Sequence, residues 1–301
     1  MTLMKTLGLR RQDLFGYALV LPAMLCVFGF IVYPVGEVIR LSFTNTSLLT
    51  KKSDFVGFES YERVLEDPLI GTVFQNTVIW VFATSSLVML IGLAVGYFLS
   101  FDFRINKALR SGILVPWILP AIVSIAAWKW MYNAEMGVLN DLLMKAGILR
   151  EGYPWLGEPG TVIYALVAVS VWRHLPFAAL VISAAVQAIP NTVLEAATID
   201  GANGWDKFRL VVMPNLGYTL SVVGVLQLIW NMNDLLTVWG STKGGPAGSS
   251  EILSTFIYDQ GFMSFRFGVS SALSVINFLV ILTASLIYLL LLKRTWRADE
   301  A

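Results

Sequence analysis

VFQNTVIWVFATSSLVMLIGLAVGYFLS, residues 73–100, is a run of 28 residues that contains no Asp, Glu, Lys or Arg. A helix that crosses the hydrocarbon core of a bilayer needs about 20 mainly apolar residues. This run exceeds that length, and it is much longer than a buried strand of a soluble protein. It therefore predicts a transmembrane helix.

Five other stretches meet the same requirement. Some contain Gly or Pro, such as Pro116 and Pro120, which membrane helices tolerate where neighbouring helices or water satisfy the freed backbone groups. Such breaks indicate either a bundle around a pathway or packing kinks. No connector is long enough for a separate domain, so we expect residues 1–301 to form one all-α membrane domain. Its six predicted spans are 14–41, 73–100, 109–132, 161–189, 216–240 and 267–292.

The composition agrees with a membrane protein. Of the 301 residues 56% are hydrophobic and 14% are charged, against about 25% charged in soluble domains. This excludes a soluble enzyme, a disordered chain and a nucleic-acid binder. The single cysteine, Cys26, and the single histidine, His174, provide no disulfide framework and no expected metal site.

The distribution of Lys and Arg predicts the orientation. Lys5, Arg10 and Arg11 precede the first apolar run as in a signal peptide, but that run is too long and lacks a small-x-small cleavage site. We therefore expect a retained helix. Four segments hold 11 basic residues and the three opposite connectors hold seven, so the positive-inside rule places both termini in the cytoplasm. The predicted cytoplasmic segments are 1–13, 102–110, 190–213 and 293–301.

The connector between the fourth and fifth spans is longer than the other internal cytoplasmic link. It reads PNTVLEAATIDGANGWDKFRLVVMP, residues 190–214. Thr192 and Glu195 have capping-box spacing and predict a helix start. Gly201 permits a tight turn or close approach of another backbone, and a second amphipathic piece, 205–212, leads to Pro214. The small apolar face of the first helix suits either docking of a partner protein or an interfacial position on the membrane; its residues are Val193, Ala196, Ala197 and Ile199.

This connector resembles the signature of bacterial ABC importer permeases. The pattern is Glu-Ala-Ala, three residues, Gly, nine residues, an aliphatic residue, one residue, then Leu-Pro. Here Glu195-Ala196-Ala197 is followed by Gly201, Val211 and Met213-Pro214 with the same spacing. Val211 replaces the usual Ile and Met213 the usual Leu, and both replacements conserve volume and polarity.

Other stretches resemble sugar permeases similar to the larger membrane subunit of maltose transporters. This likeness favours carbohydrate uptake over uptake of amino acids, phosphate or metals. The chain lacks the extra N-terminal spans and the large external insertion of the maltose protein. The matching residues are Tyr33-Pro34, Leu41-Ser42-Phe43, Gly57-Phe58-Glu59-Ser60-Tyr61, Trp128–Asn133 with Gly137 and Asn140, and Gly244-Gly245-Pro246.

The resemblance implies a bacterial inner-membrane permease with defined partners. These are a second, homologous permease subunit, a dimer of cytoplasmic ABC ATPases and an extracytoplasmic solute-binding protein. ATP and Mg²⁺ would bind to the ATPase, and this chain would hold no cofactor and perform no catalysis. Its own glycine-rich stretch, 241–250, has Lys243 before the glycines, unlike a phosphate-binding P-loop.

The same resemblance makes residues 195–201 a coupling helix seated in a cleft of the ATPase. Glu195 and Asp200 would meet basic groups of the partner. Ala196, Ala197 and Gly201 would permit close contact, and larger side chains there would clash. Pro214 completes the predicted coupling residues.

Polar residues inside a span often mark a pathway, and the fifth span holds several. Members of the subfamily use this segment for solute contact, which the resemblance carries to Asn231 and Asn233. Hydrogen bonding between helices is the alternative role. Arg173 in span four could select an anionic sugar, or it could pair with Asp234 or serve in helix packing. The predicted pathway residues are Gln227, Trp230, Asn231, Asn233, Asp234 and Arg173.

Two other classes of protein remain alternatives. An ion-coupled secondary transporter would also have polar residues at mid-membrane, but it would usually have inverted repeats and more spans. A membrane scaffold subunit could bind an ATPase without transport. A membrane-embedded enzyme is disfavoured because the lone His and lone Cys lie in different spans with no catalytic motif.

Overall fold

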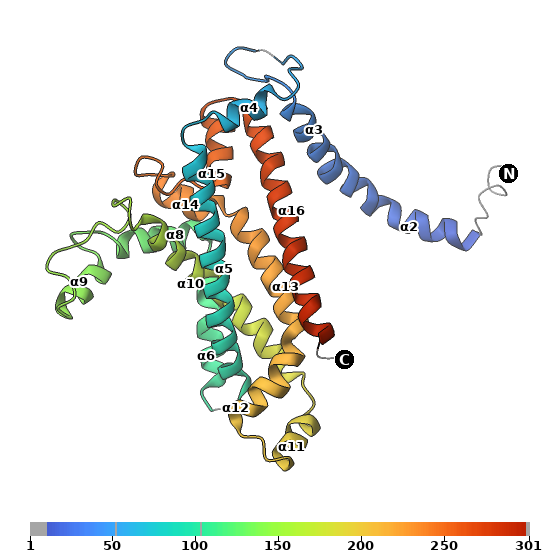
Figure 1. Ribbon diagram of the computed structural model, residues 1–301, viewed down its shortest axis with the longest axis vertical. Coiled ribbons are helices and arrows are strands. Elements are labelled where there is room, and N and C mark those ends of the chain that lie inside the picture. The colour runs from blue at the N-terminus through green and yellow to red at the C-terminus, as the bar shows by residue number, and fades with distance from the viewer. Residues whose placement is uncertain (1–10, 52, 103, 299–301) are drawn as a thin grey trace. The chain divides into compact units, whose positions relative to one another are not determined.

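The computed structural model describes residues 11–51, 53–102 and 104–298 (Figure 1). Part of the predicted cytoplasmic termini, residues 1–10 and 299–301, lies outside the described residues. Every regular element within the described ranges is a helix, and the only β-type pairing printed there is an isolated bridge between Thr44 and Phe55. The all-α prediction is confirmed.

The membrane-spanning prediction is confirmed as well. Five helical segments of the described chain are long and apolar enough to cross a bilayer, and the number is six when a bent helix pair is counted as one span. The five segments are Leu19–Ser42, Ile70–Ser100, Val162–Gln187, Gly204–Thr242 and Phe267–Leu290. The helices that form them are α2 (Arg11–Val27), η1 (Phe28–Val32), α3 (Tyr33–Ser42), α5 (Ile70–Ser100), α10 (Val162–Gln187), α12 (Gly204–Lys207), η2 (Phe208–Val212), α13 (Met213–Met232), α14 (Leu235–Thr242) and α16 (Phe267–Ala298).

The third span is broken rather than continuous. Helices α6 (Asn106–Ile113) and α7 (Val115–Ile118) meet α8 (Ala121–Met131) at an angle of 96°. Leu119 is extended, with φ −64° and ψ 135°, because a residue before proline is disfavoured in the helical region. Pro120 therefore causes the bend, whereas Pro116 occupies the first turn of α7, where proline is tolerated.

The described residues fall into two compact units. Unit 1 contains the described residues of 11–65 and 260–275, and unit 2 contains those of 66–259 and 276–298. The shorter helices are α4 (Glu59–Leu65), α9 (Val138–Lys145), α11 (Asn191–Ile199), α15 (Leu253–Tyr258) and η3 (Asp259–Met263).

In unit 1 the loop after α3 packs against the start of α16. Ser60 donates from Oγ to the Thr44 carbonyl at 2.7 Å, and the Gly268 amide donates to the Thr46 carbonyl at 3.0 Å. A Cβ at Gly268 would collide with the Thr44 carbonyl oxygen. Glycine is therefore required for this close backbone approach.

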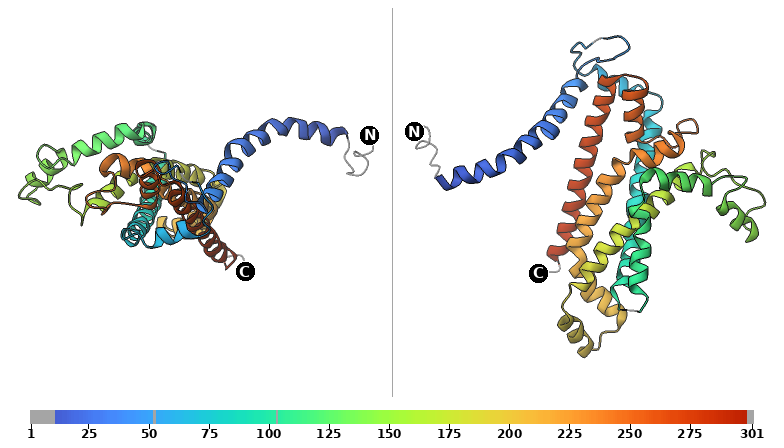
Figure 2. Two further views of the ribbon diagram at one scale, coloured as in Figure 1. Left: turned by 90° about the horizontal axis from the view of Figure 1, so that it is seen from above. Right: turned by 180° about the vertical axis from the view of Figure 1, so that it is seen from behind.

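The core of unit 2 is formed by α5, α10 and α13, which lie side by side (Figure 2). Gly92 and Gly96 of α5 face α10. A Cβ at Gly92 would lie 2.9 Å from the Ala178 Cβ, and one at Gly96 would lie 2.6 Å from the Ala179 carbonyl oxygen. Small residues four apart let two membrane helices approach closely.

Two π turns each precede a proline within a continuous helix. In η1 the Tyr33 amide donates to the Phe28 carbonyl, and Pro34 follows. In η2 the Met213 amide donates to the Phe208 carbonyl, and Pro214 follows. Proline cannot donate a backbone hydrogen bond, and its ring clashes with the carbonyl four residues earlier in an α-helix. The wider turn accommodates the ring without ending the helix.

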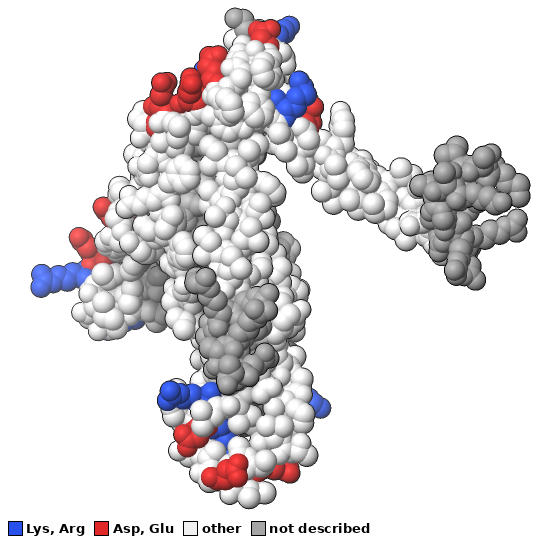
Figure 3. All heavy atoms as spheres, turned by 45° about the vertical axis from the view of Figure 1, so that its right-hand side comes forward, with Lys and Arg blue, Asp and Glu red and all other residues white. Residues whose placement is uncertain are grey.

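The charges are distributed as a membrane protein requires. On the face drawn in Figure 3, charged side chains lie in separate groups, and a wide area of described residues between the groups carries none. Many large apolar side chains are exposed, for example Phe30 and Tyr33 on the first span and Phe278 and Leu290 on α16. Such a surface is suited to contact with lipid or with other transmembrane helices.

Candidate functional site

The connector predicted to couple the chain to a partner contains helix α11. The helix begins at Asn191, and Pro190 is its N-cap, with φ −58° and ψ 133°. The predicted capping box is wrong, since Thr192 is already the second helical residue and no side chain caps this end. The fixed φ of Pro190 suits the extended N-cap conformation and starts the helix earlier.

The end of α11 explains the position of Gly201. The Gly201 amide donates to the Thr198 carbonyl at 3.1 Å, and the Ala202 amide donates to the Ala197 carbonyl at 2.9 Å. These two bonds form a Schellman motif, which needs a left-handed residue just after the helix. Gly201 is that residue, with φ +82°, and a Cβ there would meet nothing within 4 Å. Within this chain, Gly201 is therefore favoured by its backbone conformation rather than by lack of space.

One side of α11 is anchored and the other side is bare. Leu194 packs against the cluster of Ile182, Val186, Ile189, Val212 and Leu216 at the ends of α10 and α13. Ile199 is 87% exposed, and Val193 is also exposed. Glu195, Ala196, Asp200 and Gly201 are exposed, while Ala197 is half-buried. The predicted coupling residues between 195 and 201 thus lie on a small, accessible face that Leu194 anchors to the ends of α10 and α13.

The second helix of the connector has the capping box that α11 lacks. The Asn203 side chain accepts hydrogen bonds from the amides of Trp205 and Asp206, and the Asp206 carboxylate accepts one from the Asn203 amide. From α12 the chain continues through η2 into α13, so exposed Pro214 lies within a helix rather than at its start. The aromatic rings of Trp205, Phe208 and Tyr97 form successive contacts that join this segment to α5.

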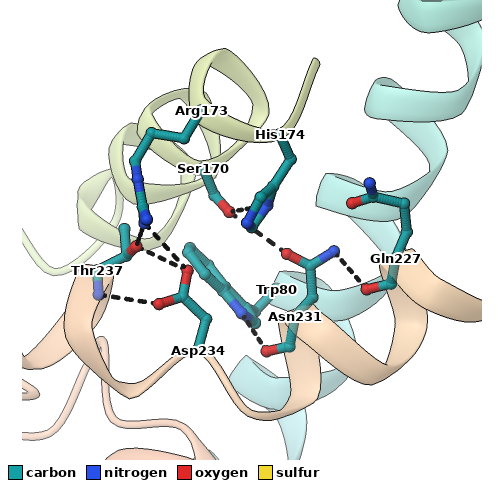
Figure 4. A network of polar contacts seen from close by, with 8 residues as sticks. All are labelled: Trp80, Ser170, Arg173, His174, Gln227, Asn231, Asp234 and Thr237. Atoms are coloured by element: carbon teal, nitrogen blue, oxygen red, sulfur yellow. Dashed lines mark hydrogen bonds and ion pairs between the residues drawn. The ribbon is translucent and has the colours of Figure 1, made fainter. Parts of the chain in front are cut away.

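The predicted pathway residues lie elsewhere in unit 2, around a break between α13 and α14 (Figure 4). Asp234 is the N-cap of α14, and its carboxylate accepts hydrogen bonds from the Thr237 amide at 3.1 Å and the Thr237 hydroxyl at 2.7 Å. Arg173 of α10 donates to the same hydroxyl at 2.7 Å, and its Nη1 lies 3.7 Å from the Asp234 carboxylate. The two charged side chains are only 17% and 10% exposed. The pairing alternative for Arg173 is therefore present in this structure.

Asn231 joins three helices. Its side chain is 0% exposed and donates to the Ser85 hydroxyl of α5 at 3.1 Å and to the Gln227 carbonyl at 2.8 Å. It accepts from Ser170 of α10 at 3.3 Å, while its backbone carbonyl accepts from the Trp80 indole at 2.9 Å. These contacts are the interhelical bonds of the alternative interpretation, and solute contact by Asn231 stays a prediction.

The other predicted pathway residues differ in their surroundings. Trp230 is partly exposed, and its ring lies 4.8 Å from that of Phe177 and 6.1 Å from that of His174. Asn233 is exposed and donates to the Ile229 carbonyl at 2.8 Å. Gln227 is fully buried, and its side-chain amide has no hydrogen-bond partner among the described residues.

The sequence interpretation missed several members of this network, namely Trp80, Ser85, Ser170, Phe177 and Thr237. Thr237 had a local signal, because Asp followed three residues later by a hydrogen-bonding residue is typical of a helix start. The other four lie on α5 and α10, so only the tertiary fold brings them to α13. In the described part of the chain, no group of three His, Cys, Asp or Glu side chains could hold a metal ion.

Residues 64–297 match the family of binding-protein-dependent transport system inner membrane components. The chain belongs to this family. It is therefore a multi-pass inner-membrane protein and the membrane component of a binding-protein-dependent transport system.

Curated permeases are similar over nearly the whole chain. The trehalose/maltose transport system permease protein MalF of Thermococcus litoralis is 31% identical over 279 residues, covering 93% of this chain and 94% of that one. The sulfoquinovosyl glycerol transport system permease protein SmoG of Agrobacterium fabrum is 29% identical over 276 residues, covering 91% and 89%.

A solved structure has the same fold. A chain in the crystal structure of a bacterial ABC transporter involved in the import of the acidic polysaccharide alginate superposes with a TM-score of 0.83. The two chains are 18% identical, and the match covers 98% of this chain and 99% of the other.

Proposed function

We propose that the chain is a permease subunit of an ATP-driven ABC importer that carries a sugar or sugar derivative into the cytoplasm. The observation that carries this proposal is the exposed face of small residues on α11. This helix packs on the ends of α10 and α13 and ends at Gly201. Such a face suits docking into a cleft of another protein. The names of the similar permeases, for trehalose/maltose and sulfoquinovosyl glycerol, support the substrate class.

The remaining subunits follow from this role. A second, related permease completes the pathway, and a dimer of cytoplasmic ATPases binds ATP and Mg²⁺. An extracytoplasmic binding protein delivers the solute, as the alginate transporter in complex with its periplasmic protein illustrates for that system. The chain itself performs no hydrolysis. Closure of the ATPases moves α11, and α10 and α13 transmit the motion, so the pathway alternates between its two openings.

Within the chain, the surface around Trp230 is best suited to the solute. The indole and the Phe177 ring give apolar faces on which a sugar ring can stack. Arg173, Asp234 and exposed Asn233 supply hydrogen-bonding groups nearby. Asn231 is a predicted solute contact beside this surface, and it also holds α5, α10 and α13 together.

Replacement of Gly201 tests the coupling face. Gly201→Asn keeps a residue that tolerates a left-handed backbone but adds a side chain to the docking face. Gly201→Asp adds a charge as well. We expect both variants to remain in the membrane and to lose ATP-driven solute uptake and co-purification of the ATPase.

The outcome for Gly201→Asn separates docking from local folding. Normal uptake by this variant would show that the glycine serves only the Schellman motif, and the coupling proposal would fail. Asn231→Ala provides the second comparison. Equal loss of basal and solute-stimulated ATP hydrolysis indicates the packing role, whereas selective loss of stimulation indicates solute contact.

A further inference from the structure

A polar cavity lies where the end of α5, the start of α6 and the end of α10 meet. Its volume is about 550 Å³, and it is lined by Arg104, Lys107, Arg110, Asp102, Asn106 and Gln187 among others. None of these side chains belongs to the Arg173–Asp234 network or to the bare face of α11. The cavity is therefore a separate site.

The cavity has excess positive charge. Three cations face a single carboxylate, that of Asp102. The ion pairs identified among the described residues involve none of these four side chains. Their positive charge is thus available to an anion from outside the chain.

Two buried polar atoms also lack a partner there. Arg110 donates from Nη2 to the Leu99 carbonyl at 2.7 Å, but its Nε is buried with no acceptor among the described residues. Asn106 is 6% exposed and donates from Nδ2 to the Leu99 carbonyl at 2.9 Å, while its Oδ1 has no donor. A buried polar atom without a partner costs about 1–3 kcal/mol. The Arg110 guanidinium is therefore held against the end of α5 without an anionic partner among the described residues.

The start of helix α6 also favours an anionic ligand. Asn106 is the first residue of the eight-residue helix α6. The amides and dipole at the start of a helix attract negative charge, and phosphate is a common occupant of such ends.

The position of the cavity along the chain indicates its surroundings. Helix α5 ends at Ser100, and α6 begins the broken third span, so the cavity lies at the end of two membrane-spanning segments. Phospholipid headgroups occupy this depth, and basic pockets between transmembrane helices bind anionic headgroups.

We propose that this cavity binds a phosphate group, supplied by an anionic phospholipid headgroup or by a soluble phosphate. Lys107, Arg110 and Arg104 hold the phosphate oxygens. The Asp102 carboxylate accepts a hydrogen bond from a hydroxyl adjoining the phosphate, as in a glycerol headgroup. Binding at this cavity does not depend on the transported solute.

The test uses the full chain, with any subunits that remain bound, in nanodiscs of equal parts phosphatidylglycerol and phosphatidylcholine. Lipids that stay on the protein are counted by native mass spectrometry after gentle release. We expect the wild type to retain phosphatidylglycerol selectively. Lys107→Gln removes one charge from an exposed side chain and should lower this retention about tenfold, as for loss of one charge-assisted hydrogen bond. Arg150→Gln, an exposed cation outside the cavity, should retain the wild-type amount.

A second arm distinguishes the two sources of phosphate. Inorganic phosphate is titrated into the detergent-solubilised protein while its thermal unfolding is followed. Stabilisation of the wild type but not of Lys107→Gln, without selective lipid retention, identifies a soluble phosphate as the occupant. Selective phosphatidylglycerol retention identifies the headgroup. If the wild type and Lys107→Gln behave alike in both arms, no phosphate site exists here.

Discussion

At the scale of single residues, Asp234 has three roles. It caps α14, accepts a hydrogen bond from the Thr237 hydroxyl and forms an ion pair with Arg173 of α10. A charge inside a membrane domain is costly unless it is paired. The cap and the ion pair together therefore fix the break between α13 and α14 beside Trp230.

We expect Arg173→Gln and Asp234→Asn each to destabilise the protein by about 3 kcal/mol, because each leaves one buried charge unpaired. Asparagine can still cap α14, so the Asp234→Asn loss reports mainly the charge. The double variant should lose less than the sum of the two. Thermal unfolding of all four proteins in detergent measures this coupling, and additive losses would show that the pair contributes no stability.

Glu251 is a second residue in an unusual environment, between α14 and α15 and outside the spanning segments. Its side chain is 8% exposed, and Oε1 has no hydrogen-bond partner among the described residues. The pKa of this carboxyl is raised to about 7, chiefly by burial and to a smaller extent by Asp259, against the lowering effect of a hydrogen bond with Thr255. The carboxyl also packs on Gly244, where any Cβ would collide with it.

The raised pKa predicts a pH dependence of stability. Below about pH 4.5 the carboxyl is protonated in both the folded and the unfolded protein, so it has no effect. As the pH rises from there to about 7, the unfolded chain ionises more readily and the folded state loses stability; above 7 the loss is constant. Glu251→Gln should therefore unfold at a higher temperature than the wild type at pH 8, and the two should converge towards pH 5. Parallel pH profiles would contradict this expectation.

At the scale of helices, α5 and α10 are the pair that positions both functional regions. Arg173 and Ser170 lie on α10, Trp80 and Ser85 lie on α5, and the end of α10 supports α11. Gly92 and Gly96 permit this pairing. A change in the distance between α5 and α10 would therefore disturb both functional regions of unit 2.

Gly96→Leu should lower the amount of folded protein strongly, because its side chain would meet the Ala179 backbone and Ile182. Gly71→Leu is the matched control on the same helix, since a Cβ at Gly71 meets nothing within 4 Å. Fluorescence-detected size exclusion of tagged variants in mild detergent compares the two. Equal peaks for both variants would show that α5 does not need a close approach at Gly96.

The helices themselves could be predicted from the sequence, but their interruptions could not all be predicted. Apolar length identified the six spans because lipid accepts few charged residues in a helix. It did not show that Pro120 bends the third span by 96° while Pro116 leaves α7 intact. Thr192 had the spacing of a capping box, but Pro190 set the start of α11. The Arg173–Asp234 contact was one of two alternatives in the sequence, and only the packing of α10 on α13 brings the side chains together.

At the scale of the whole molecule, the apolar surface of the two units remains to be covered. In Leu19–Ser42 none of the most apolar stretch of 18 residues is buried, against 56% of the corresponding stretch in Val162–Gln187. The apolar surface of the first span is therefore available to lipid or to transmembrane helices, whereas much of α10 is enclosed within unit 2. Cys26, the single cysteine, is exposed on this first span.

Chemical labelling of Cys26 can measure whether the first span is shielded from water. A charged maleimide does not enter hydrocarbon, so it reaches only a thiol that is in contact with water. We expect a charged, membrane-impermeant maleimide to leave Cys26 unlabelled in native membranes from either side, and to label it after the protein is unfolded in dodecyl sulfate. Rapid labelling in intact membranes would place Cys26 in water and would contradict a lipid-facing first span.

The π turn at Phe208–Val212 also determines how α12 is rotated about the helix axis relative to α13. Each residue of an α-helix advances the chain by about 100° around the axis, and the wider turn inserts one residue without breaking the helix. Deleting a single residue from this turn, together with replacement of Pro214, would leave α12 and α13 helical but would rotate α12 by about 100° around the axis of α13, while Leu194 keeps α11 on the end of α10. In this family, insertions and deletions at that turn would therefore turn α12 relative to α11, changing which side of α12 faces a partner docked on α11.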